Sequence, residues 1–481
     1  LRLYNTLKWS LKDMRKLLLA LASAVVVVLL CSIVCIACTK TPAANNTLWD
    51  ERVESDYLYN DTRDYINYAK EVDWDYEQFP YLDECGLFWY SWDSSAKQLL
   101  EEPADSELGA SFVDPTKPTV VFIHGMQMDG YAYRNDYQVP AVLSPAETLG
   151  LTELSSSDKF YIQYAWLNKG WNVGMFHWER FSSGEGGALL ELPTGNEERI
   201  WATDGPSKDR HIDPTGYPHF GATEYSIAEH FAAEYIRAMN LLPDNMGEEE
   251  IRFVAHSMGG QVVAAGLFLL TELAHPDVNQ ISVDKLPNRY ALIDTYFGTV
   301  VKLDNGESFI MGPEDITVRW SGKTLPQGKI KDTIFDCLKV FNRFGIVMEY
   351  IAYKGSFLLM SLDKADMREF LEYATITDAR LNWGDMYSND PKLGWVTTWE
   401  LQHGHVAMLH LYGCSIAADK CPDITDSDVI AYAPSAALPT EELRKLVGNY
   451  YLLTEGGTGF DMGKHKYTQP GLDALFEFLV D

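Results

Sequence analysis

Hydrophobic and polar positions along the central part of the chain predict strands that alternate with helices. Short, mainly apolar runs bounded by polar or turn residues are typical of strands buried on both faces of a sheet. Apolar residues recur at helical spacing from Tyr225 to Met239, and a second helix is predicted from Gln261 to Leu273. Strands that alternate with helices imply a mostly parallel sheet flanked by helices. The predicted strands are Gly86–Tyr90, Thr119–Ile123, Asn172–Phe176, Ile251–Ala255 and Tyr290–Ile293.

Changes in composition divide the 481 residues into three parts. Residues 1–40 are predicted to be an export signal or a membrane or lipid anchor, and residues 41–78 an acidic tether or arm. Residues 79–481 are long enough for one large α/β domain or two smaller ones. Within them, residues 296–400 break the rhythm and include an apolar stretch, Phe344–Met360, that is interpreted as helical. We therefore expect a cap or lid over residues 296–400.

The amino-terminal segment contains an uninterrupted apolar run from Leu17 to Cys38, preceded by Arg15 and Lys16. The run is long enough to span a bilayer and has the layout of an export signal; a buried core helix is the alternative. Cleavage would release the protein, or leave a lipid on Cys38 if the residues before it, which imperfectly resemble a bacterial lipobox, are a processing site. Without cleavage the run remains as a membrane anchor. The export and anchor interpretations all predict a secreted or surface-anchored protein.

The formal net charge of −30 argues against binding to nucleic acid or anionic lipid. Residues 1–38 are net basic, so the remainder of the chain is more acidic still. Outside the apolar run the cysteines are Cys85, Cys337, Cys414 and Cys421, an even number that permits disulfides in an exported protein. The last two are close enough in sequence to close a small loop. No His/Cys cluster has the spacing of metal ligands, so neither a metal nor another cofactor is expected.

Ser257 carries the most informative motif of the chain. An apolar strand ends just before it, and a helical pattern follows at once. A nucleophilic serine is mounted on such a sharp strand-to-helix turn, which needs small residues two positions on either side. Ala255 and Gly259 occupy these positions. The turn also aims the backbone N–H of Met258 toward the site where an oxyanion would form.

Other residues that could assist the serine also directly follow predicted strands. Ligands of parallel sheets bind at the carboxyl ends of the strands, where we expect His124, His177, Ser257 and Asp294 to gather. In the loop after the strand that ends at Ile123, we expect His124 to organise the backbone and Gly125 to allow it to turn. The N–H of Met126 is then the second oxyanion donor.

The acid that orients the catalytic base is predicted to be Asp294, because it follows an apolar strand beyond the serine. Asp378 and Asp385 are weaker candidates, since no clear strand leads into them.

The base is expected last in the chain, within Gln402–His410. His410 is interpreted as a structural residue of a helix. His403 and His405 lie on either side of Gly404, and the pattern alone does not separate them; His405 lies immediately before a helical run.

These segments resemble the α/β-hydrolase superfamily, specifically lipase-like serine hydrolases of the pancreatic-lipase type. The resemblance covers roughly residues 118–416. It implies an α/β-hydrolase fold and a triad of Ser257, Asp294 and His405, with His405 favoured over His403 by the residues that follow it. The matching motifs are Val254–Gly260 (similar to G-H-S-x-G-G, with Ala255 for the first glycine), Phe122–Gly125, Asn172-Val173 with Trp178, Leu292–Asp294, and His405 with Tyr412 and Ser415-Ile416.

The predicted function is therefore that of an exported serine hydrolase that cleaves small-molecule or lipid acyl esters through an acyl-enzyme, without a cofactor. A thioesterase, acyltransferase or peptidase could use the same residues. The alternative from another class is a non-catalytic surface lipoprotein that binds ligands with the same fold.

Overall fold

A computed structural model gives the structure of the chain. It describes residues 47–50, 52–59, 75–80, 85–96, 98–125, 138–140, 159–182, 192–202, 211–212, 218–219, 225–244, 246, 249–302, 308–311, 315–353, 362, 364–380, 412, 434–454 and 466–468. The chain separates into two compact units, residues 1–51 and 52–481. Every feature described below belongs to the second unit, except helix α2 (Thr47–Asp50).

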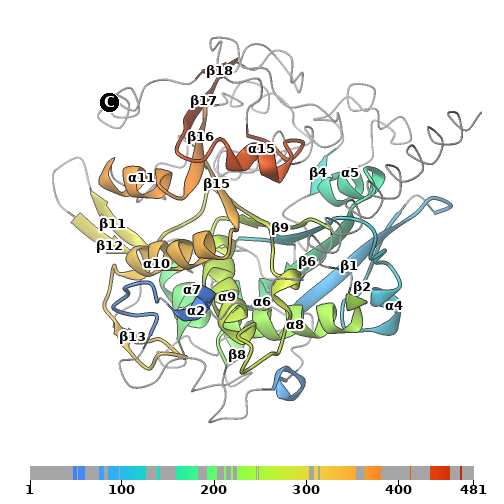
Figure 1. Cartoon of the computed structure of the whole chain (residues 1–481), viewed down its shortest axis with the longest axis horizontal. Coiled ribbons are helices and arrows are strands. Elements are labelled where there is room, and N and C mark those ends of the chain that lie inside the picture. Colours follow the sequence, from blue (N-terminus) through green and yellow to red (C-terminus); the bar gives the residue numbers. More distant parts are fainter. Residues whose placement is uncertain are drawn as a thin grey trace, which may run out of the picture. The chain divides into compact units, whose positions relative to one another are not determined.

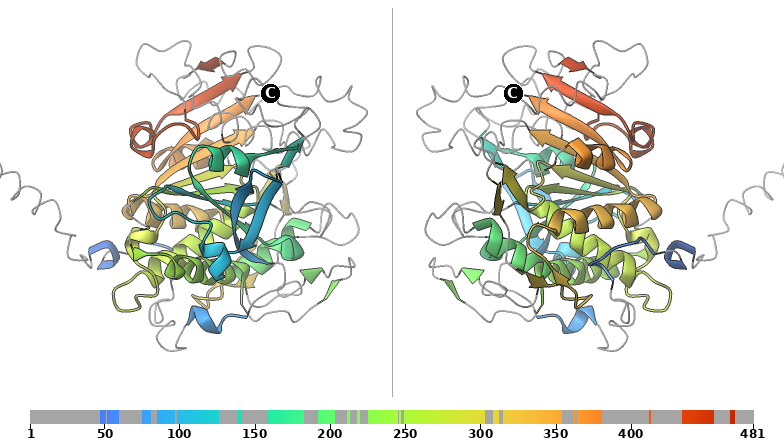
Figure 2. Two further views of the ribbon diagram at one scale, coloured as in Figure 1. Left: turned by 90° about the vertical axis from the view of Figure 1, so that its right-hand side faces the viewer. Right: turned by 90° about the vertical axis from the view of Figure 1, so that its left-hand side faces the viewer.

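A ten-stranded sheet with the order β2-β1-β6-β3-β9-β10-β15-β16-β17-β18 forms the centre of the second unit. Strands β6 to β17 of this order run parallel to one another, whereas β1 is antiparallel to β6, β2 to β1, and β18 to β17. Figure 2 shows the sheet extending from the blue strands β1 and β2 at one edge to the red strands β17 and β18 at the other. The strands are β1 (Gly86–Asp93), β2 (Gln98–Pro103), β3 (Thr119–Ile123), β6 (Asn172–His177), β9 (Ile251–His256), β10 (Arg289–Ile293), β15 (Val347–Tyr353), β16 (Ala374–Arg380), β17 (Tyr450–Thr454) and β18 (Lys466–Thr468).

Side-chain alternation on β10 defines the two faces of the sheet. The hydroxyl of Tyr290 donates to the carbonyl of Gly260 on one face, whereas the guanidinium of Arg289 donates to the carbonyl of Ser435 on the other. Helices α8 (Ile227–Leu241), α9 (Gly259–Leu273), α10 (Ile330–Arg343) and α11 (Lys364–Leu371) cover the Tyr290 face. Helices α5 (Ile162–Asn168) and α15 (Thr440–Arg444) lie on the Arg289 face (Figure 1).

This arrangement confirms the predicted mostly parallel sheet with flanking helices. All five predicted strands are present, and both predicted helices are found as α8 and α9. The start of α8 is encoded locally by a capping box: the Ser226 hydroxyl accepts from the N–H of Glu229, and the Glu229 carboxylate accepts from the N–H of Ser226.

The expectation of a cap over residues 296–400 is wrong for a large part of that region. Strands β15 and β16 pair in parallel within the central sheet, and α10 and α11 pack on its face. The stretch Phe344–Met360, interpreted as helical, instead contains β15 from Val347 to Tyr353. A short apolar run does not distinguish a buried strand from a buried helix by its periodicity, which explains the error. Residues 381–400 lie outside the described ranges.

Part of the predicted acidic arm also belongs to the domain. Leu58 and Tyr59 are buried, and the Tyr59 ring meets Phe268 of α9 edge to face at 5.6 Å between centroids. The Ser321 hydroxyl donates to the carbonyl of Tyr57 over 2.7 Å. The domain therefore begins earlier than the predicted residue 79.

The apolar run Leu17–Cys38 lies outside the described residues, and none of the described helices is long and apolar enough to cross a membrane. Cys85 and Cys337 are buried free thiols, while Cys414 and Cys421 lie outside the described ranges.

Shorter elements complete the described chain. The helical ones are η1 (Tyr76–Gln78), α4 (Glu107–Ala110), α6 (Glu179–Ser182), α7 (Leu192–Trp201) and η4 (Val283–Lys285). The strands pair as four antiparallel hairpins: β4 (Gln138–Pro140) with β5 (Lys159–Tyr161), β7 (His211–Ile212) with β8 (Pro218–His219), β11 (Thr299–Lys302) with β12 (Ser308–Met311), and β13 (Ile316–Thr317) with β14 (Thr324–Leu325).

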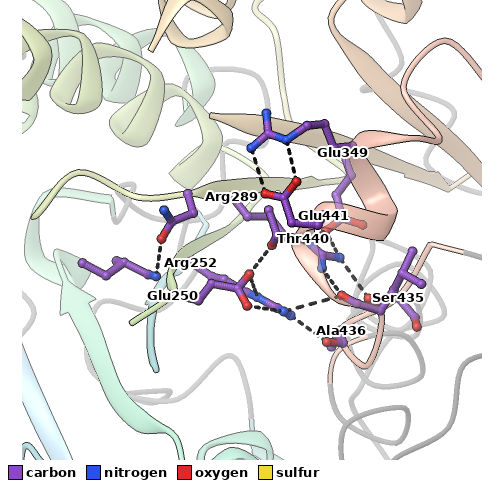
Figure 3. A network of polar contacts seen from close by, with 12 residues as sticks. Glu250, Arg252, Arg289, Glu349, Ser435, Ala436, Thr440 and Glu441 are labelled. Atoms are coloured by element: carbon purple, nitrogen blue, oxygen red, sulfur yellow. Dashed lines mark hydrogen bonds and ion pairs between the residues drawn. The ribbon is translucent and has the colours of Figure 1, made fainter. Parts of the chain in front are cut away.

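A buried ionic network on the Arg289 face ties segments distant in sequence to the amino ends of the strands (Figure 3). The guanidinium of Arg289 donates to the carboxylate of Glu349 over 2.6 Å and to the carbonyl of Leu438 over 2.7 Å. The hydroxyl of Tyr412 donates to the same carboxylate. Burial opposes the charge of Arg289, but Glu349 and Tyr412 hold its pKa above the usual value. Arg252 continues the network by donating to Glu250 and to the carbonyl of Ala436.

Candidate active site

Ser257 lies on a strained turn between β9 and α9. Its φ of +52° is in the left-handed region that residues other than glycine rarely adopt. Its N–H donates to the carbonyl of Ile293 over 2.9 Å, and its own carbonyl accepts from the N–H of Gly260 over 3.0 Å. Met258 follows as the N-cap residue of α9. This geometry holds the serine at the carboxyl end of a central strand, as nucleophile turns of this kind require.

The turn is in close contact with the loop that follows β3. A Cβ atom at Gly125 would lie 2.7 Å from the Cβ of Ser257, and one at Gly259 would lie 2.5 Å from the carbonyl oxygens of Ile123 and His124. Only glycine permits these two approaches, so the loop backbone reaches the serine directly. Met126, the predicted second oxyanion donor, is the next residue along the loop and lies outside the described ranges.

Asp294 follows β10, the strand next to β9, and is buried with a φ of +43°. Its N–H donates to the carbonyl of Ile351 over 2.7 Å. Asp378, by contrast, lies inside β16, where its carboxylate accepts from the hydroxyl of Tyr450 over 2.9 Å. Burial, and then the carboxylates of Asp294 and Asp378, raise the pKa of Tyr350. Of these two acids, Asp294 occupies the strand end adjacent to the serine turn; Asp385 lies outside the described ranges.

His124 is bound into the loop through both ring nitrogens. Its Nδ1 lies 2.7 Å from the carbonyl oxygen of Gly125, and its Nε2 accepts from the N–H of Trp178 over 3.0 Å. The Trp178 indole in turn donates to the carbonyl of His124 over 2.9 Å. With Nε2 as an acceptor, Nδ1 carries the proton and donates to Gly125. This imidazole therefore holds the loop and has no nitrogen left to serve as a base.

A series of hydrogen-bonded, mostly buried polar side chains lies behind this loop, and the sequence did not predict it. His177 lies 2.6 Å from a carboxylate oxygen of Glu179 through Nδ1 and 2.7 Å from the hydroxyl of Tyr90 through Nε2. The Tyr90 hydroxyl donates to Glu101 over 2.7 Å. The other Glu179 oxygen lies 3.5 Å from Nε2 of His124. Burial opposes ionisation of Glu179, but the adjacent His177 holds its pKa well below the usual value.

His124, His177 and Glu179 are residue types that bind metals, and their ligand atoms lie within 4.8 Å of one another. The hydrogen bonds nevertheless use the electron pairs that a cation would need. The Trp178 N–H points at Nε2 of His124, and the 2.6 Å between His177 and Glu179 is shorter than the ~3.3 Å between two ligand atoms of a tetrahedral zinc ion. The cluster as it stands is arranged for protons rather than for a metal. Spacing along the sequence gave no signal for it, because His124 is remote from the other two residues.

The predicted base lies beyond the described residues, as do His403 and His410. Tyr412, a few residues further on, is described and buried, and its carbonyl accepts from the Trp166 indole over 2.7 Å. Tyr412 is therefore bonded to helix α5 through its carbonyl and, through its hydroxyl, to Glu349 of β15. The structure thus places Ser257, Asp294, His124, Gly125, Met258 and Gly259 along one sheet edge, and leaves His405, His403 and Met126 as predictions.

Comparisons with known proteins find only distant structural similarities. No family model and no curated protein matches the chain. The fold is that of an α/β hydrolase. Among solved structures, the chain is similar to a thioesterase domain from the curacin biosynthetic pathway, with 12% identity over 55% of this chain and 84% of that one and a TM-score of 0.24. It is also similar to the 2-hydroxy-6-oxo-6-phenylhexa-2,4-dienoate hydrolase (BphD) from Rhodococcus sp. strain RHA1, with 12% identity over 56% and 75% of the two chains and a TM-score of 0.17.

Such distant similarities carry no argument about chemistry. The fold assignment rests on the strand order and on the Ser257 turn of this chain itself.

Proposed function

We propose that this chain is an exported serine hydrolase that cleaves carboxylic acyl esters through an acyl-enzyme intermediate. The observation that carries the proposal is the backbone of Ser257, which has a φ of +52° at the turn from β9 into α9 and is contacted by Gly125. Strain of this kind persists where the surrounding structure enforces it, and it is characteristic of nucleophile turns. Asp294 at the end of the adjacent strand supports the assignment of the acid.

In the proposed reaction, the Ser257 oxygen attacks the ester carbonyl while His405 accepts the serine proton. Asp294 holds the imidazole in the required tautomer and stabilises its positive charge. The N–H groups of Met126 and Met258 stabilise the tetrahedral oxyanion. The alcohol leaves with the proton from His405, and water, activated by the same imidazole, then releases the acid and regenerates the serine. No cofactor takes part.

Lipase-like substrates and export are the finer parts of the proposal. The motif resemblance favours acylglycerols or other acyl esters as substrates. The apolar run Leu17–Cys38, preceded by Arg15 and Lys16, supports secretion or attachment at a membrane surface.

A fluorophosphonate probe tests the proposal directly. The wild-type protein is expected to be labelled, and Ser257→Ala is expected to abolish both labelling and the hydrolysis of p-nitrophenyl esters. Ser321→Ala is a matched control at a buried serine, and it should leave the labelling unchanged. The Ser321 hydroxyl donates to the carbonyl of Tyr57 and accepts from the N–H of Lys323, not from a residue of the site. If the wild-type protein is not labelled, or if labelling survives Ser257→Ala, the proposal is wrong and a non-catalytic binding role takes its place.

Two further comparisons refine the assignment. Rates on p-nitrophenyl esters of increasing chain length, measured beside acyl thioesters and peptide amides, identify the leaving group that is preferred. His405→Ala should lose turnover whereas His403→Ala should retain it; the reverse result would exchange the two assignments.

A further inference from the structure

A chain of buried hydrogen bonds connects a partly exposed carboxylate with the residues that hold the loop beside the serine. It starts at Glu101, whose side chain is 24% exposed, and passes through Tyr90 and His177 to Glu179. Trp178, which lies between His177 and Glu179 in the sequence, donates its backbone N–H to His124. Its members come from β2, β1, β6, α6 and the end of β3, so only the folded sheet brings them together.

The hydrogen-bond directions determine where the protons lie. Tyr90 has one hydroxyl proton, which it donates to Glu101, so its oxygen must accept from Nε2–H of His177. The carboxylate of Glu179 can only accept, so Nδ1 of His177 carries a proton as well. With these directions His177 donates to Tyr90 and to Glu179, and its contact with Glu179 is buried: the two side chains are 2% and 9% exposed.

Trp178 links this pair to the loop, because it lies between His177 and Glu179 in the sequence. Its backbone N–H donates to Nε2 of His124 over 3.0 Å, and its indole donates to the carbonyl of His124 over 2.9 Å. His124 in turn donates to the carbonyl of Gly125, whose backbone is packed against Ser257. Met126, the predicted second oxyanion donor, follows Gly125 directly in the sequence, so we expect a displacement of the Gly125 backbone to affect this donor.

We infer that the His177–Glu179 ion pair is a positioning pair, which holds the oxyanion loop against Ser257 through His124. This inference rests on the proposed serine chemistry. The pair touches no reacting atom; it acts by fixing the place of a hydrogen-bond donor. Catalysis by such donors is sensitive to small displacements, because they must be in place before charge develops in the transition state.

The test is Glu179→Gln, which keeps an acceptor of the same shape but removes the charge that pairs with His177. We expect kcat on a p-nitrophenyl ester, and the rate of fluorophosphonate labelling, to fall by at least about tenfold while KM stays within about twofold. A purely structural role would change the melting temperature and leave the kcat of the folded protein unchanged.

Glu234→Gln is the matched control. Glu234 is also a buried carboxylate, and it is paired with Arg237 over 2.6 Å on α8. This variant should keep the wild-type kcat, so a kcat loss equal to that of Glu179→Gln would overturn the inference. Tyr90→Phe removes the acceptor of His177 Nε2–H together with the hydrogen bond to Glu101, and it provides a second variant if Glu179→Gln does not fold. An unchanged kcat in this variant would also overturn the inference.

Three more outcomes separate the alternatives. If the wild-type protein retains about one equivalent of zinc and a chelator abolishes its labelling, the cluster is a metal site rather than an ion pair, and the inference is overturned. Wild-type protein that is not labelled at all would overturn the proposed function, and the inference with it. Normal labelling of both the wild-type protein and Glu179→Gln would overturn the inference alone.

Discussion

Replacing Glu197 by glutamine should make the stability of the domain less dependent on pH. Glu197 lies on α7 and is fully buried, and one of its oxygens accepts from the amide of Gln261 over 2.9 Å. The Gln261 oxygen accepts from the Trp201 indole, and its amide also donates to the carbonyl of Tyr296. Burial, partly offset by the Gln261 hydrogen bond, raises the pKa of Glu197 from 4.5 to about 8.

The size and sign of the effect follow from the difference in pKa between the folded and unfolded states. Between pH 4.5 and about 8, the unfolded chain has lost the Glu197 proton while the folded chain still holds it. The free energy of unfolding therefore falls as pH rises, by about 1.4 kcal/mol per pH unit and about 5 kcal/mol in total. This contribution is fully present below pH 4.5 and is lost by pH 8. Glutamine is neutral throughout and keeps the acceptor for Gln261, so Glu197→Gln should remove the slope.

Urea unfolding followed by tryptophan fluorescence, at several values from about pH 5 to about pH 8, measures this difference. The Glu197→Gln variant should gain stability over the wild-type protein as pH rises. Glu441→Gln, at a side chain that is 75% exposed, is a control that should keep the wild-type slope. If the wild-type and Glu197→Gln curves stay parallel over this range, Glu197 is not held neutral by the fold and the reasoning is wrong.

Three further substitutions test the site and the network. Gly125→Ala places a Cβ 2.7 Å from that of Ser257 and should lower kcat on a p-nitrophenyl ester at least about tenfold; an unchanged kcat would contradict the close contact. Asp294→Asn should lower kcat by about 10⁴ in a protein with a normal circular dichroism spectrum, whereas a loss below about tenfold would remove Asp294 from the triad. Glu349→Gln leaves Arg289 buried without its counter-charge and should reduce the free energy of unfolding by about 3–5 kcal/mol in urea titrations. A reduction below about 1 kcal/mol would show that the network does not depend on this pair.

The strand, the turn and the helix around Ser257 could be predicted because their determinants are neighbours in the sequence. An apolar run buried on both faces, small residues at Ala255 and Gly259, and the helical pattern that follows define β9, the turn and α9 by local rules. The same holds for Asp294, since its position depends only on recognising the end of β10. The capping box at Ser226 is another local signal of this kind.

Other strands and contacts could not be predicted, because the local sequence pattern was ambiguous or gave no signal. The run from Val347 to Tyr353 suits a buried helix as well as a buried strand, and only pairing with β10 and β16 decides between them. Glu179 gave no signal, because its meaning depends on His124, a residue brought close by the pairing of β3 with β6. Arg289 and Glu349 likewise become partners only when β10 and β15 lie side by side.

The sequence by itself therefore determined the strands and helices around Ser257 and the order of Ser257 and Asp294 along one sheet edge, because hydrophobic periodicity and turn geometry act over a few residues. The tertiary structure alone decided which buried charges compensate one another and how the Gly125 loop is held against Ser257. The physical reason is that a buried charge or a backbone contact is stabilised by whatever group the fold places within a few ångströms, and that group can come from anywhere in the chain.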